Sequence, residues 1–82
     1  MVTPAVGRLW QPSESPIEVH IMDVSRNGMG LTAVTPVMAG SSVCIIHGQL
    51  MVKGTVAYCR ESTGKYAIGI SITRVMRAAG EI

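Results

Sequence analysis

At 82 residues the chain has the length of one small domain, and we expect residues 1–82 to form a single unit around one core. Apolar residues make up 48% of the sequence and charged residues 15%, which excludes a disordered chain, while polar residues interrupt the apolar runs too often for a transmembrane helix. The net charge of +2 is spread along the chain, and the only aromatic residues are one Trp and two Tyr, so we expect no DNA or RNA partner. No secretory signal pattern is present at the N-terminus, which predicts a bacterial or other cytoplasmic location.

Alternation of apolar and polar residues recurs along the chain and predicts an all-β fold. The first strand is expected over residues 5–10, and the proline-containing loop "QPSESP" follows it. In the second strand, residues 17–24, Ile17, Val19 and Ile21 share one face and Glu18, His20 and Met22 share the other. The alternation breaks over residues 22–24, as it does where a strand bulges or ends beside a site. A third strand over residues 29–34 and a loop over residues 35–42 come next.

Two tight turns predict the pairing of the remaining strands. A two-residue turn at His47-Gly48 places Ile46 opposite Gln49, and a three-residue "STG" loop with Gly64 in the left-handed conformation places Val56 opposite Ile70 and Tyr58 opposite Ile68. The expected shared core face comprises Val43, Ile45, Leu50, Val52, Val56 and Tyr58. The chain is therefore predicted to form a six-stranded antiparallel meander that closes into a small barrel, with a short helical turn over residues 75–80.

Residues that could carry chemistry are few. Cys44 and Cys59 are expected on the outer face, too far apart for a disulfide, and so as free thiols. His20 and His47 are the only histidines and show no metal-ligand spacing, so we expect no metal and no cofactor. Ser25 lacks the surroundings of a catalytic nucleophile, and paired carboxylates are scarce. We therefore expect the protein not to be an enzyme.

The exception is "DVSRNG", residues 23–28, which matches the pattern Asp/Asn-x-Ser-x-x-Gly. Together with the later segments "TVAYCR" and "YAIGI", it resembles the PilZ domain family over roughly residues 5–76, nearly the whole chain. In that family a six-stranded antiparallel barrel carries the motif at the end of its second strand. The resemblance implies binding of the bacterial second messenger cyclic di-GMP.

The chemistry of the motif is compatible with such a ligand. The Asp23 carboxylate can accept hydrogen bonds from N1 and the exocyclic N2 of guanine, and Ser25 can bond to a phosphate or to the base. Gly28 allows the backbone to turn so that its amides face an anion, while Arg26 can add charge or stack on a base, with Asn27 beside it. The alternative is that Asp23 and Ser25 only satisfy the backbone of a tight turn.

The second motif of the family, Arg-x-x-x-Arg ahead of the first strand, is absent. Arg8 is the only arginine upstream, and Pro4 and Pro12 occupy the positions four residues away from it. Two such arginine contacts contribute about 1.5–3 kcal/mol each, so we expect cyclic di-GMP binding to be weak or undetectable.

Two interpretations stay open. In the first, the chain is a nucleotide receptor whose arginines lie outside this sequence or on a partner chain. In the second, it is a nucleotide-independent adaptor that contacts bacterial proteins in pilus, motility or polysaccharide control. The sequence leaves the oligomeric state open. For an adaptor, the relevant surface is the expected outward face, with Met22, Cys44, Ile46, Met51 and Ala57.

Overall fold

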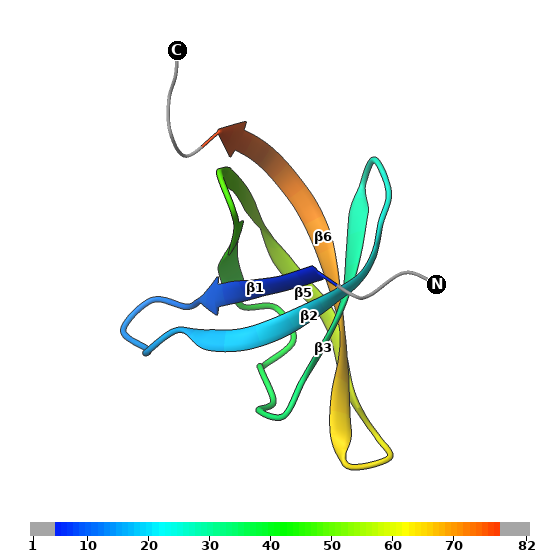
Figure 1. The fold of residues 1–82 in the computed structure, drawn as a ribbon. Coiled ribbons are helices and arrows are strands. Elements are labelled where there is room, and N and C mark those ends of the chain that lie inside the picture. The colour runs from blue at the N-terminus through cyan, green and yellow to red at the C-terminus, as the bar shows by residue number, and fades with distance from the viewer. Residues whose placement is uncertain (1–4, 78–82) are drawn as a thin grey trace.

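The structure, a computed structural model, describes residues 5–77, which form six antiparallel strands closed into a barrel (Figure 1). The order around the barrel is β1-β2-β3-β6-β5-β4, and pairing of β1 with β4 closes it. The strands are β1 (Ala5–Trp10), β2 (Ile17–Val24), β3 (Gly28–Ala33), β4 (Ser42–His47), β5 (Leu50–Ser62) and β6 (Lys65–Arg77). The predicted all-β, six-stranded antiparallel barrel is confirmed.

The predicted meander, in which each strand pairs with the next one in the chain, is wrong. In a meander β3 would pair with β4, whereas here β3 pairs with β6 and the chain crosses over to β4. The crossing segment between β3 and β4 is held to the barrel, because Val37 is buried and Gly40 N–H donates to the Val56 carbonyl at 2.7 Å. This crossover frees β6 to lie beside the strand that follows the "DVSRNG" motif.

Alternating residues of every strand fill the barrel interior, as the period of two requires. No polar or charged side chain is buried among the described residues 5–77. Burial of each large apolar side chain contributes about 1.5–3 kcal/mol relative to exposure in water. The largest fully buried side chains are Leu9, Val19, Leu31, Ile45, Val56 and Ile68.

Both hairpin turns differ in position from the prediction, although in the β5–β6 hairpin the predicted pairing of Val56 with Ile70 is confirmed and only that of Tyr58 with Ile68 is wrong. The β4–β5 turn consists of Gly48-Gln49, so His47 lies opposite Leu50 and the register is displaced by two residues, which preserves the faces. Gly48 has φ +60, which suits the first central position of a type II′ turn. The β5–β6 turn is Thr63-Gly64, both with positive φ, as in a type I′ turn. The left-handed conformation of Gly64 is confirmed.

Three strands carry one extra residue each. Met22 in β2, Ala57 in β5 and Thr73 in β6 have no partner in the registers on either side of them. Because side chains alternate between faces, each extra residue exchanges inside and outside for the residues beyond it. Past Ala57, Tyr58 is therefore turned outward and is 44% exposed, and Cys59 packs against the core. The predicted core position of Tyr58 and outer position of Cys59 are wrong for this reason.

The ends of the barrel account for the remaining differences. Leu50, expected in the core, begins β5 at an open end and is 44% exposed. Residues 75–77 continue β6 instead of forming a helical turn, and residues 78–80 of that prediction lie outside the described residues. Both cysteines are free, as predicted. Within residues 5–77, no helix meets the length and hydropathy needed to cross a membrane.

Candidate functional site

A row of four residues runs across the outer face of β2, β3, β6 and β5. Asp23 lies opposite Gly30, Gly30 opposite Gly69, and Gly69 opposite Tyr58. The two central positions have no side chain, and the two outer positions carry an acid and an aromatic ring. The row therefore forms a floor of backbone that two unlike side chains flank and partly cover.

Each glycine makes room for the wall beside it. A Cβ atom on Gly30 would lie 2.9 Å from Oδ1 of Asp23, and a Cβ atom on Gly69 would overlap the ring of Tyr58. The carboxylate and the ring thus lie over the backbone of the adjacent strands. Between them is an open hollow of about 260 Å³, which Ser25, Gly28 and Ala57 also border. We call this the glycine-floored hollow.

Two β-bulges turn the side chains of Asp23 and Tyr58, the two walls of the hollow, to the outer face. If Met22 paired as an ordinary strand residue, Asp23 would share the inward face of Ile21. If Ala57 did so, Tyr58 would share the inward face of Val56. The break in alternation predicted for residues 22–24 is confirmed as a bulge between Ile21 and Asp23. Bulges commonly re-aim a side chain beside a functional site, and here one stands at either edge of the hollow.

The β2–β3 turn forms one end of the hollow. Both the backbone N–H and the hydroxyl of Ser25 donate to the carbonyl of Gly28, at 2.8 and 3.3 Å. Ile72 N–H donates to the Asn27 carbonyl at 2.9 Å and so ties the turn to β6. The Ser25 hydroxyl therefore has a structural partner, and because it is exposed it can also accept a bond from a ligand.

The structure brings together three of the five predicted site residues. Asp23, Ser25 and Gly28 border the hollow, whereas Arg26 lines a different cavity at the end of the barrel. Asn27 contributes its main-chain carbonyl to the turn and is not among the residues that border the hollow. Gly28 does not have the positive φ expected of a turn glycine. Its role is close approach, because a Cβ there would lie 3.3 Å from the Ile70 carbonyl oxygen.

Two residues that the sequence reasoning did not place in the site are Tyr58 and Arg60. Tyr58 forms the aromatic wall, and the guanidinium carbon of Arg60 lies 4.9 Å from the centre of its ring. A cation at this distance is attracted to the ring and holds its orientation. The signal in the sequence that could have indicated this wall is Gly69, because a glycine inside a strand often marks a place where another group approaches the backbone closely.

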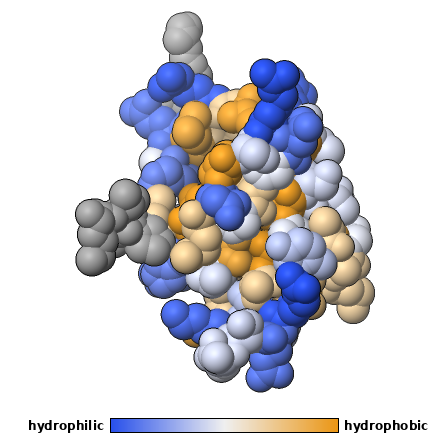
Figure 2. Space-filling model, turned by 90° about the vertical axis from the view of Figure 1, so that its right-hand side faces the viewer, coloured by the Kyte–Doolittle hydropathy of each residue, from blue (hydrophilic) through white to orange (hydrophobic). Residues whose placement is uncertain are grey.

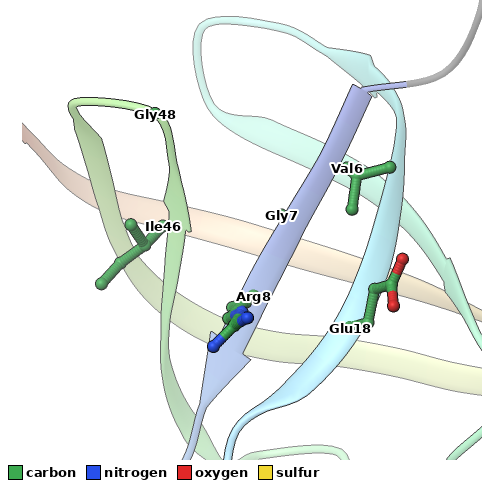
Figure 3. Close-up of a pocket in the computed structure, with 6 residues that line it drawn as sticks. All are labelled: Val6, Gly7, Arg8, Glu18, Ile46 and Gly48. Atoms are coloured by element: carbon green, nitrogen blue, oxygen red, sulfur yellow. The ribbon is translucent and has the colours of Figure 1, made fainter.

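Arg8, the only arginine upstream of the motif, lies elsewhere. It borders a groove of about 410 Å³ over β1 with Glu18 of β2 and Ile46 of β4, and a Gly7 without a side chain deepens that groove (Figure 3). Arg8 pairs with Glu18, five residues before Asp23 in β2, and at about 3.3 Å per residue the separation is roughly 16 Å. Arg8 therefore does not reach the glycine-floored hollow.

The described residues hold no cluster of three or more His, Cys, Asp or Glu side chains that could bind a metal ion. A scan against models of protein families matched none of them, and a search of curated proteins found no significantly similar sequence. The case for a function therefore rests on the residues of the hollow and their geometry.

Proposed function

We propose that the protein is a non-enzymatic regulatory domain similar to PilZ domains, and that the glycine-floored hollow accepts a guanine of cyclic di-GMP with low affinity. The observation that carries this proposal is the row Asp23–Gly30–Gly69–Tyr58, in which a carboxylate and an aromatic ring lie over two glycines that have no side chains. A planar base can enter the hollow that these two side chains border, and the carboxylate can accept both hydrogen bonds of the guanine N1–N2 edge.

The size and charge of the hollow support low affinity. Its volume of about 260 Å³ is below the range of roughly 300–1,000 Å³ typical of small-molecule pockets, so it suits one base and not a whole dinucleotide. No Lys or Arg borders it among the described residues, and the guanidinium of Arg60, behind the aromatic wall, is engaged with the Tyr58 ring, so the phosphates would lack a free cationic partner at the hollow. Each missing charge-assisted contact costs about 1.5–3 kcal/mol.

We expect wild-type protein to bind cyclic di-GMP with a dissociation constant on the order of 1 mM at low salt, following the loss of two such contacts. Amide chemical shifts followed by NMR during titration would measure it. The shifts should be confined to residues around Asp23, Gly30, Tyr58 and Gly69. Asp23→Ala should abolish them, because no other acid in the described part of the chain borders the hollow.

The matched control is Glu18→Ala, which removes the same charge from the same strand on the same outer face. It should bind like the wild type. Cyclic di-AMP, whose base lacks the guanine donor edge, should give no shifts at the hollow. The receptor proposal fails if Asp23→Ala binds normally or if cyclic di-AMP binds equally well. Micromolar affinity would contradict the weakness that the missing arginines imply.

The second candidate is a nucleotide-independent adaptor, and a continuous outer stripe favours it. Ile46 lies opposite Met51, and Met51 opposite Met76, so three half-buried apolar side chains adjoin across β4, β5 and β6. Of the predicted outward residues, Met22 and Ala57 are exposed and Cys44, Ile46 and Met51 are half-buried. Figure 2 shows that apolar residues also gather on the side of the barrel that carries the β2–β3 turn. Absence of any nucleotide-induced shift would favour this candidate.

A further inference from the structure

An apolar cavity opens at one end of the barrel, beside the β2–β3 turn, the β4–β5 turn and the end of β6, which lie at the top of Figure 1. Its volume is about 250 Å³. Ile21, Val52 and Ile72 form its buried or half-buried depth. Val24, Leu50 and Val75 form its rim and are 59%, 44% and 55% exposed. We call this cavity the barrel mouth.

A bulge in β6 positions part of the rim of the barrel mouth. The extra residue Thr73 changes the face of the residues beyond it, so that Val75 lies opposite Val52 and Arg77 opposite Leu50. The Thr73 hydroxyl donates to the Lys53 carbonyl at 3.0 Å and holds this bulge in place. On the other side, His47 Nδ1–H donates to the Val6 carbonyl at 2.8 Å and joins the β4–β5 turn to β1. Bonds between strands therefore brace the opening on two sides.

The charged side chains around the mouth, among the described residues, are all basic. Arg26 lines it, and Arg77 ends β6 opposite the rim residue Leu50. No acidic side chain lines it among residues 5–77. The nearest acid in sequence, Asp23, directs its carboxylate over Gly30 on the outer face. An apolar interior with basic groups at its entrance complements a molecule with an apolar tail and an anionic head.

We propose that the barrel mouth binds a straight-chain carboxylate of about eight carbons, with its alkyl tail inside and its carboxylate at Arg26. At roughly 30 Å³ for a water-sized group, the cavity holds about eight methylene groups. The mouths of small β-barrels are a common place for such ligands. A second copy of the chain is disfavoured as occupant, because two mouths facing each other would bring like charges together.

This proposal does not depend on nucleotide binding, since Asp23 is not part of the mouth. The two sites do adjoin, because Ser25 and Met29 border both of them. Asp23→Ala should therefore leave carboxylate binding unchanged even where it abolishes nucleotide binding. Failure of one proposal is thus distinguishable from failure of the other.

The test is an NMR titration of the full chain with sodium octanoate below its micelle concentration. We expect saturable shifts at the amides of Val24, Leu50 and Val75, and small ones at Leu9 and Ile17. Arg26→Gln should weaken binding about threefold to tenfold, the range for a partly exposed charge contact. Arg60→Gln, the same change outside the mouth, should leave affinity unchanged, and octyltrimethylammonium should bind more weakly than octanoate.

Several results would overturn the proposal. One is the absence of shifts at the rim, and another is equal binding of octanoate and octyltrimethylammonium, which would show that the basic rim is irrelevant. Rim signals that change on dilution, with a dimer in sedimentation, would identify a second copy as occupant. Nuclear Overhauser contacts from Ile82 to Val75 would identify the chain's own terminus instead.

Leu50→Glu, which places a charge at the exposed rim, should abolish octanoate binding while the barrel spectrum persists.

Discussion

Gly54→Ala is expected to destabilise the barrel by about 2–3 kcal/mol, although it adds one methyl group. A Cβ atom on Gly54 would overlap the Ser71 carbonyl oxygen and lie 2.9 Å from Cγ2 of Ile70. The backbone of β6 cannot move aside, because Ser71 pairs with Thr55 of β5 and with Gly28 of β3. For a domain of this size we expect the midpoint of thermal unfolding to fall by about 10–20 °C. Circular dichroism would measure it.

Gly48→Ala is the control for this effect. Gly48 has open space where a Cβ would lie, and its φ of +60 is the only obstacle to a side chain. A left-handed conformation costs an L-residue about 1–2 kcal/mol. Gly54→Ala should therefore lower stability more than Gly48→Ala does. Equal effects would mean that β5 and β6 are not packed as closely at Gly54 as the structure shows.

Ile45→Ala is expected to cost about 2–5 kcal/mol, because it removes a fully buried side chain and leaves a cavity. Ile45 lies between Leu9 of β1 and Val52 of β5. Only residues 8–10 of β1 pair with β4, so Ile45 fills the core where the barrel closes. Urea denaturation followed by circular dichroism or Trp10 fluorescence would give the change in free energy of unfolding.

Ile46→Ala deletes the same atoms from the next residue, which is half-buried on the outer face. It should cost about 1 kcal/mol, in proportion to the apolar surface that it covers. A larger loss at Ile46 than at Ile45 would mean that the two faces of β4 are assigned the wrong way round. The pair thus tests the register of β4 directly.

The strands were predictable because alternation is a local property of the sequence. Residues 17–24 show it clearly, and β2 has the predicted bounds, with Val19 and Ile21 buried. The bulge at Ala57 was not predictable in this way, because an extra residue is defined only against the partner strand. Tyr58 continues the alternation of Val56, so the sequence alone predicts a core position for it. The crossover from β3 to β4 likewise depends on distant pairing.

The candidate site was predictable only on the side of the motif. Asp23, Ser25 and Gly28 are close in sequence, so their pattern alone indicates a shared site. The opposite wall depends on Gly30 meeting Gly69 and on Gly69 meeting Tyr58, contacts between residues far apart in the chain. The sequence shows which chemical groups these residues carry, but predicting that they lie side by side requires the register of four strands.

The paired bulges mean that the hollow depends on how β2 and β5 pair with their neighbours as well as on which residues they contain. If β2 were regular, Asp23, two residues after the buried Ile21, would point into the barrel; a related sequence without the extra residue would place its aspartate directly after the buried residue and still point it outward. The same holds for the residue between Val56 and Tyr58. In comparing such barrels, a wall residue can therefore reach the outer face with or without a bulge, so its spacing from the preceding buried residue is informative only together with the register of the partner strand.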